Sequence, residues 1–245
     1  MTAADHTHAT HPIALVTGGN KGIGLGLVKQ LAQAGWTVYL GSRDAARGQA
    51  ARDSLPAELD VRVLALEVTE AATLQAAADS VRQQSGRLDV LINNAGICPD
   101  IEPPSKATLD SLRSTYETNV FGPVLVVQAM LPLLRAGTLK RIVNVSSELG
   151  SATLHGDPNF KYGFVNGLSY CSSKSALNAF TVLLSKELYA EGFAVNAVNP
   201  GYTATDLNGH SGTLSVEQAA ATVAGVAMSE LGTGSFFTEG GRLPW

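Results

Sequence analysis

The chain has 245 residues, of which 45% are hydrophobic and 16% are charged, and its formal net charge is −4. This length suits one large α/β domain, and without a basic block there is no electrostatic case for a nucleic acid or an anionic membrane as partner. The two cysteines are too few for a disulfide scaffold, so we expect a reduced, cytoplasmic setting.

The N-terminal residues 1–11 are polar and contain His6, His8 and His11. The segment has no apolar core like that of a signal peptide, and we predict a flexible leader. No cysteine or carboxylate cluster accompanies the histidines at ligand spacing, so no metal site is predicted.

Short apolar runs alternate with amphipathic segments along the rest of the chain. Strands are predicted at residues 13–16, 36–40, 61–66, 88–92, 141–145, 194–198 and 235–237. Helices are predicted at residues 22–34, 45–55, 71–84, 108–134, 170–190 and 216–228. This alternation predicts an α/β fold, with a single Rossmann-type doubly wound parallel sheet of about seven strands and helices on both faces. No linker divides it, so one domain is expected over residues 12–245.

The most apolar segment, residues 120–134, belongs to the fourth predicted helix. It is shorter than the roughly 20 residues that a membrane helix needs, and it contains Gly122, Pro123 and Gln128. We therefore expect no membrane span.

Three irregular segments, residues 98–107, 150–169 and 201–215, each follow a predicted strand. Ligands of open α/β sheets bind at the carboxyl ends of the strands. These segments are therefore the expected surroundings of a site.

Three glycines, Gly18, Gly22 and Gly24, stand between the first strand and the first helix in the run TGGNKGIG at residues 17–24. Glycine lets the backbone approach a pyrophosphate closely, and a helix N-terminus adds unpaired N–H groups with partial positive charge. A tight strand-to-helix turn also uses glycine for steric reasons alone. The position in the first βα unit favours a dinucleotide site, although the spacing departs from G-x-G-x-x-G.

The second strand leads into Ser42 and Arg43, where no carboxylate stands at the strand tip. An acidic residue there would bind a free ribose 2′-hydroxyl, whereas a basic residue pairs with a 2′-phosphate. Arg43 offers a planar donor fork, and Asp44 suits the N-cap of the next helix. Lys21 in the glycine run adds a second cation. The sequence therefore predicts NADPH, the alternative being that both cations are ordinary solvated surface groups.

Tyr170 and Lys174, in the run YCSSK, are four residues apart and so share one helix face. A tyrosine pKa of about 10 is too high for ready proton exchange near neutrality, and a nearby ammonium lowers it. We expect a lowered pKa and a general acid at Tyr170. At this spacing the aliphatic part of a lysine more often simply packs against the tyrosine ring, so the pair alone does not establish a catalytic role.

When further motifs are considered together with these two runs, the chain resembles the carbonyl-reductase-like branch of the short-chain dehydrogenase/reductase family. The resemblance spans nearly the whole domain in the family's order. Besides the two runs above, it rests on SRDAARGQAA at residues 42–51, LDVLINNAG at 88–96, TNVFG at 118–122, VNVSS at 143–147 and NPGYTATD at 199–206.

The resemblance implies a set of cofactor contacts. The glycine loop contributes Gly18, Asn20, Lys21, Gly22, Ile23 and Gly24, and the adenosine end is held by Ser42, Arg43, Glu67, Val68, Asn94, Ala95 and Gly96. Glu67 replaces the family's usual aspartate and is one methylene longer. The nicotinamide end is held by Tyr170, Lys174, Pro200, Gly201, Thr203 and Thr205.

The resemblance also implies a catalytic set of Asn119, Ser147, Tyr170 and Lys174. Tyr170 would protonate the substrate oxygen, Ser147 would hydrogen-bond it, Lys174 would hold the nicotinamide ribose, and Asn119 would help to hold a water that links the lysine to solvent. Ser146 is the adjacent hydroxyl and is the alternative to Ser147.

The predicted function is NADPH-dependent reduction of a neutral, largely apolar ketone or aldehyde. The insert at residues 153–167 is rich in aromatics, and it either lines the pocket or packs on the body. The alternatives are a 3-oxoacyl-thioester reductase, for which we find no basic carrier patch, and a non-catalytic NADPH-binding regulator, which would tend to lose the tyrosine or the lysine. Relatives often form homodimers or homotetramers through the two long helices, while some stay single.

Overall fold

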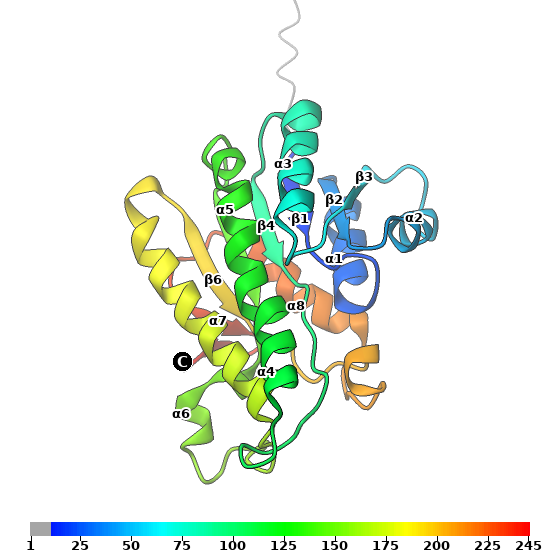
Figure 1. The fold of residues 1–245 in the computed structure, drawn as a ribbon. Helices are drawn as coiled ribbons and strands as arrows, with labels where there is room; N and C mark the ends of the chain where they lie inside the picture. Colours follow the sequence, from blue (N-terminus) through cyan, green and yellow to red (C-terminus); the bar gives the residue numbers. More distant parts are fainter. Residues whose placement is uncertain (1–10) are drawn as a thin grey trace, which may run out of the picture.

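The computed structural model describes residues 11–245, and within them eight strands form one sheet in the order β3-β2-β1-β4-β5-β6-β7-β8 (Figure 1). The strands are β1 Ile13–Val16, β2 Thr37–Ser42, β3 Val61–Ala65, β4 Val90–Asn93, β5 Arg141–Val145, β6 Ala194–Val198, β7 Phe236–Thr238 and β8 Gly241–Leu243. All neighbours are parallel except β7 and β8. The strand order reverses between β1 and β4, which is where an open α/β sheet binds its ligand.

Helices cover both faces of the sheet (Figure 1). They are α1 Gly22–Gln33, α2 Ala45–Asp53, α3 Ala71–Ser85, α4 Leu109–Tyr116, α5 Gly122–Arg135, α6 Ala152–His155, α7 Leu168–Glu187 and α8 Val216–Met228. Alternate residues of β1 enter opposite cores, as the pleat requires. Ala14 and Val16 pack with α1, α2 and α8, whereas Ile13 and Leu15 pack with α3, α5 and α7. The predicted doubly wound fold is confirmed.

The predicted long helix at residues 108–134 is not continuous. A π-helical turn, η1 Glu117–Phe121, separates α4 from α5 and contains Asn119. Such turns add one residue to the helical repeat and often occur at functional sites. The sequence did not predict this π-helical turn, because the apolar pattern of the residues before and after it is that of one continuous helix.

Two further elements were not predicted. The short helix α6 begins the insert, and β8 pairs antiparallel with β7 at the sheet edge. The last residue, Trp245, stacks on Phe236, and its carbonyl oxygen accepts a hydrogen bond from Thr153 N in α6. The chain end therefore fixes the start of the insert. The leader predicted at residues 1–11 lies outside the described residues apart from His11.

The run Leu109–Arg135 is long and apolar enough by composition to cross a membrane. In the fold its second half, α5, packs against the core, because Val126, Met130 and Leu134 are buried in the cluster to which α3 and α7 contribute. Burial against the sheet accounts for its apolar character.

Candidate functional site

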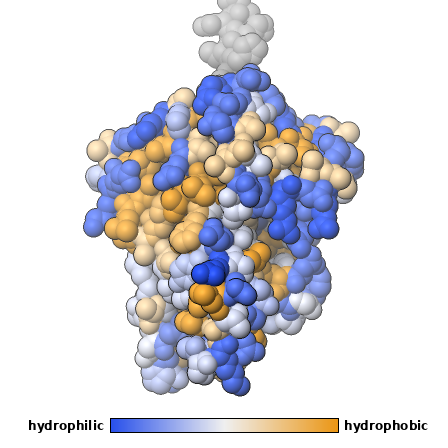
Figure 2. All heavy atoms as spheres, in the orientation of Figure 1, coloured by the Kyte–Doolittle hydropathy of each residue, from blue (hydrophilic) through white to orange (hydrophobic). Residues whose placement is uncertain are grey.

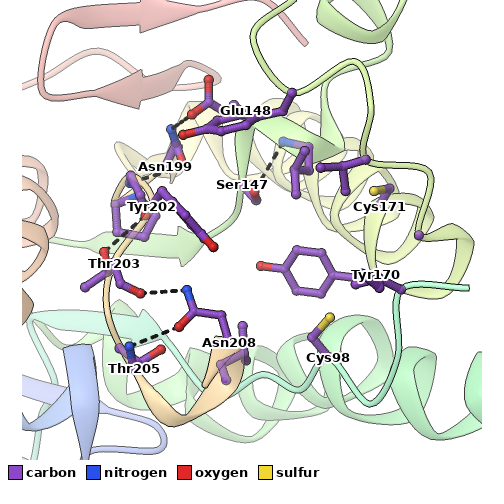
Figure 3. Close-up of a pocket in the computed structure, with 18 of the residues that line it drawn as sticks. Cys98, Ser147, Glu148, Tyr170, Cys171, Asn199, Tyr202, Thr203, Thr205 and Asn208 are labelled. Carbon is purple, nitrogen blue, oxygen red and sulfur yellow. Dashed lines mark hydrogen bonds between the residues drawn. The ribbon is translucent and has the colours of Figure 1, made fainter. Parts of the chain in front are cut away.

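A cavity of about 490 Å³ lies at the carboxyl ends of β4, β5 and β6 (Figure 3). Its walls come from segments that are far apart in the sequence, including the start of α1, the start of α7 and the loop after β6. It brings together seven of the predicted site residues, namely Ile23, Ser147, Tyr170, Pro200, Gly201, Thr203 and Thr205. The remaining ones lie behind its walls or along the edge of the sheet.

The glycine loop is packed against the turn that follows β4. Gly18 and Gly22 have φ of 62° and 51°, which favour glycine. A Cβ on Gly24 would stand 2.2 Å from the Gly18 carbonyl oxygen and 2.6 Å from Asn94 Nδ2. Asn94 Nδ2 in turn donates to the carbonyl oxygen of Thr17 at 2.9 Å. Sterics therefore demand these glycines even without a ligand.

The N-terminus of α1 supplies the independent sign of a phosphate site. Its N-cap, Lys21, places no side-chain acceptor on the first-turn N–H groups. Uncapped N–H groups at a helix N-terminus attract an anion. The residues of the loop therefore fit the pyrophosphate of a dinucleotide.

Lys21 itself is engaged elsewhere. Its ammonium lies 2.7 Å from Asp206 Oδ2 in the loop after β6, and Asp206 also contacts His210. Lys21 is the main reason that the pKa of Asp206 lies below its usual range, with a smaller contribution from His210. This exposed pair bridges the glycine loop to the loop that carries Thr205, a contact that spacing in the sequence did not indicate.

The tip of β2 has the predicted arrangement. Asp44 is the N-cap of α2 and accepts a hydrogen bond from Arg47 N at 3.0 Å, as the sequence indicated. Ser42 is buried and donates to the carbonyl oxygen of Asp44 at 2.7 Å. Arg43 is exposed between them. No carboxylate therefore occupies the strand tip.

Glu67 and Val68 follow β3 in the predicted place. The Glu67 carboxylate accepts a hydrogen bond from Thr69, and the buried Val68 packs on Gly122 of α5, where a Cβ would stand 2.8 Å from it. Asn94, Ala95 and Gly96 form the turn beyond β4, and Thr17 Oγ1 accepts from the N–H groups of Asn94 and Ala95.

The phenol of Tyr170 points into the cavity between Ser147 and Cys98 (Figure 3). Burial raises its pKa, the nearby Cys98 adds to this, and the Ser147 hydroxyl opposes it by hydrogen bonding to the phenol. The prediction of a lowered pKa is therefore wrong for the protein without cofactor. Desolvation is the largest cause, so the phenol keeps its proton at neutral pH.

Lys174 is buried one helical turn further along α7. Its ammonium lies 5.6 Å from the centre of the Tyr170 ring and donates to the carbonyl oxygen of Val145 at 2.8 Å. Burial lowers the pKa of Lys174 to about 8. The carbonyl at the end of β5 therefore orients the amine beside the phenol.

The two adjacent serines after β5 face different surroundings. Both border the cavity, but their hydroxyls have different partners, and Ser147 Oγ accepts from Leu149 N at 3.2 Å. The Ser146 hydroxyl donates to Asn178 Oδ1 at 2.6 Å in the interior. Of the two serines, only Ser147 acts on the pKa of Tyr170. The geometry favours Ser147 over its neighbour for contact with a substrate oxygen.

Asn119 holds the turn beyond β4 from the π-helical segment. Its side chain accepts from Ile97 N at 2.8 Å and donates to the Ile97 carbonyl oxygen at 2.9 Å and to Ser173 Oγ at 3.1 Å. A Cβ on Gly96 would stand 3.3 Å from Asn119 Oδ1 and 3.6 Å from Lys174 Nζ. Asn119 and Lys174 therefore border the same glycine.

The insert at residues 153–167 lines the cavity through Tyr162, Phe164, Val165 and Gly167. Its aromatic rings form a chain of edge-to-face contacts that reaches Tyr202 of the loop after β6. Of the two alternatives that the sequence left open, the structure therefore selects the pocket wall.

A family model for the short chain dehydrogenases matches residues 12–213. The chain belongs to the short-chain dehydrogenase family. It is 33% identical to a (+)-neomenthol dehydrogenase of Arabidopsis thaliana, over 92% of this chain and 95% of the relative. It is 33% identical to a (−)-isopiperitenone reductase of Mentha piperita, over 84% of this chain and 89% of the relative. An NADPH-bound carbonyl reductase from chicken fatty liver has a TM-score of 0.85 at 30% identity, over 96% of this chain and 99% of that one.

This short-chain dehydrogenase is therefore an oxidoreductase with a nicotinamide-binding fold, and carbonyl reductases are among its relatives. Cofactors of this class fit the uncapped helix α1 and the glycine loop. The predicted membership in the family is confirmed.

Several residues of the cavity were not singled out in the sequence as site residues. Glu148 and Asn199 are buried in its wall, and the half-buried Cys98 and Cys171 also line it. Burial raises the pKa of Cys98 to about 11. Glu148 directly follows Ser147 at the end of β5, and that position was the one available signal.

Replacing Lys174 with methionine is expected to stabilise this short-chain dehydrogenase in the absence of cofactor. Because burial lowers the pKa of Lys174 from 10.5 to about 8, the folded state bears the full cost of the charge below pH 8. That cost disappears as the pH rises toward the unfolded pKa. We expect Lys174→Met to raise the free energy of unfolding by about 1–2 kcal/mol at pH 7, after the lost hydrogen bond to Val145 is subtracted.

Urea unfolding of both proteins at pH 7 and pH 10 measures this effect. The gain of Lys174→Met should vanish at pH 10. A destabilised variant at pH 7, or an equal gain at both pH values, would contradict the burial argument.

Proposed function

We propose that this chain is an NADPH-dependent carbonyl reductase, one domain over residues 12–245, which reversibly reduces ketones and aldehydes to alcohols. The observation that carries the proposal is the phenol of Tyr170, which points into a mostly apolar cavity beside Ser147 and near Lys174. A proton donor beside a phosphate-binding helix N-terminus suits hydride transfer coupled to protonation.

The chain's own residues are proposed to hold the cofactor in three places. The N–H groups of α1 and the glycine loop bind the pyrophosphate, with Asn20 in that loop. Arg43, exposed at the tip of β2, pairs with the 2′-phosphate, and Glu67, Val68 and the turn at residues 94–96 border the adenosine. Lys174 and the loop that carries Pro200, Gly201, Thr203 and Thr205 border the nicotinamide end.

In the reaction, reduced nicotinamide supplies the hydride that the carbonyl carbon accepts. Tyr170 donates its proton to the carbonyl oxygen, and Ser147 donates a hydrogen bond to the same oxygen. The Lys174 ammonium stabilises the phenolate that remains. The raised pKa of Tyr170 keeps its proton on the phenol at neutral pH, as the proton donor of a reduction requires.

Neutral apolar carbonyl compounds are the proposed substrate class. Ile101, Tyr162, Phe164 and Leu207 give the cavity apolar walls. Among the described residues that line it there is no lysine or arginine to clamp a carboxylate or phosphate. Lys161 stands near the wall, but it pairs with Glu148.

Two alternatives are kept. A 3-oxoacyl-thioester reductase would act through the same residues, and a non-catalytic NADPH sensor would bind cofactor without turnover. Oxidation of NADPH by wild-type protein with acetophenone distinguishes the enzyme from the sensor, and a matched assay with a 3-oxoacyl thioester distinguishes the two enzymes. Binding of NADPH without oxidation by any ketone, aldehyde or thioester would overturn the proposal.

Pairing of chains through α5 and α7 remains a prediction, as does a cytoplasmic location. Figure 2 shows apolar residues gathered on the face over these helices, which supports the association. Leu183 of α7 and Tyr189 just beyond it are 65% and 71% exposed. Light scattering of the purified protein measures whether it is a homodimer, a homotetramer or a single chain.

A further inference from the structure

A carboxylate is buried in the wall of the otherwise mostly apolar cavity. Glu148 begins the short 3-10 turn η2 Glu148–Gly150 after β5, and only 7% of the residue is exposed. It lines the cavity next to Ser147, on the side away from Tyr170 (Figure 3). Glutamate is rarely buried unless it is paired, because losing water costs the charged form free energy.

The partners of Glu148 use only part of its acceptor capacity. Oε1 accepts from Asn199 Nδ2 at 3.2 Å and lies 3.2 Å from Lys161 Nζ. Within residues 11–245 no hydrogen bond reaches Oε2. An ionised carboxylate accepts about four hydrogen bonds, so the Glu148 carboxylate retains acceptor capacity.

The charge of the pair determines which donor suits this acceptor. Lys161 is exposed on the insert and already balances the charge of Glu148. A cationic substrate group would have to compete with that ammonium, whereas a neutral hydroxyl would add a hydrogen bond without a second positive charge. Hydrogen bonds from hydroxyl groups to carboxylates are short and strong.

We propose that Glu148 binds a hydroxyl group of the substrate, remote from the carbonyl group that Tyr170 protonates. The substrate class is then a hydroxylated aromatic or apolar ketone. The inference rests on the proposed function and deepens it, since it names a specificity residue for the same cavity. A site built for a substrate hydroxyl rejects the analogue that lacks it, because the buried acceptor is left unpaired.

The test compares acetophenone with its meta-hydroxyl and para-hydroxyl derivatives and with an aminomethyl derivative. In wild-type protein we expect kcat/KM for the better hydroxyl derivative to exceed that for acetophenone by about tenfold or more. Glu148→Gln keeps the shape and the acceptor for Asn199 but puts an amide NH₂ in place of an oxygen. The hydroxyl preference should fall to about one, through KM, while kcat/KM for acetophenone changes by less than about threefold.

Asp157→Asn, an exposed acid of the same insert, is the matched control and should keep the preference. A wild-type ratio near one for both hydroxyl derivatives would overturn the proposal, as would a preference for the aminomethyl compound. An equal loss for all ketones in Glu148→Gln would also overturn it, because that pattern belongs to a purely structural role.

Calorimetric binding of the same compounds to wild type and Glu148→Gln, in the presence of NADP, separates this inference from the proposed function. Suppose that no ketone is turned over, but that the hydroxyl derivative binds more tightly than acetophenone and that Glu148→Gln abolishes this difference. The carbonyl reductase proposal then fails, while the assignment of Glu148 as the hydroxyl-binding residue is supported. If turnover occurs without that difference in binding or in kcat/KM, the Glu148 assignment fails alone.

Discussion

Replacing Tyr170 with phenylalanine is expected to lower kcat for ketone reduction by about 10³-fold, because the proton donor is lost while the ring remains. The ring packs beside the Lys174 ammonium at 5.6 Å, and phenylalanine preserves that packing. The Kd for NADPH should therefore change by less than about threefold. Steady-state oxidation of NADPH and fluorescence titration of the cofactor measure the two quantities separately.

Tyr189→Phe is the matched control for Tyr170→Phe, since Tyr189 lies just beyond the same helix and is 71% exposed. It should keep the wild-type rate. If Tyr170→Phe retained most of the rate, the assignment of the proton donor would be wrong, and a water or another side chain would have to supply the proton.

Replacing Arg43 with aspartate is expected to lower the ratio of kcat/KM for NADPH to kcat/KM for NADH by about 100-fold or more. The change removes a charge-assisted contact to the 2′-phosphate and introduces repulsion, while aspartate accepts a hydrogen bond from a free 2′-hydroxyl. Because Arg43 is exposed at the tip of β2 and makes no contact that holds the strand, the fold should be retained.

Arg113→Asp changes the net charge equally at an exposed position of α4, far along the chain from the strand tip. It should leave the cofactor preference unchanged. An Arg43→Asp variant that kept its preference for NADPH would contradict the selectivity argument, and would direct attention to Lys21.

Short-range sequence patterns were sufficient to predict most strands and helices and the glycine loop that is proposed to bind the cofactor. The strand β1 and helix α1 follow from an apolar run that ends in glycines, and Asp44 was recognised as an N-cap from its type and place alone. These features depend on neighbours within a few residues, which a sequence displays directly. The π-helical turn at Asn119 escaped because its side-chain contacts lie with Ile97 and Ser173, far away in the chain.

The surroundings of the site required the folded chain. The pKa of Tyr170 is raised mainly by burial, which the spacing between Tyr170 and Lys174 does not reveal. The ion pair of Lys21 with Asp206 joins residues 185 positions apart, and no spacing rule predicts it. Glu148 became a candidate only when the cavity showed it buried beside Ser147.

Transfer of label from NADPH that carries deuterium at both hydrogen positions of C4 of the reduced ring is the most direct test of the central claim. The account predicts that wild-type protein delivers the label to the carbinol carbon of the alcohol, one deuterium for each NADPH oxidised, and that Tyr170→Phe binds the labelled cofactor but delivers it at least about 10²-fold more slowly. An alcohol formed without deuterium on that carbon, or equal rates of delivery by the two proteins, would contradict it.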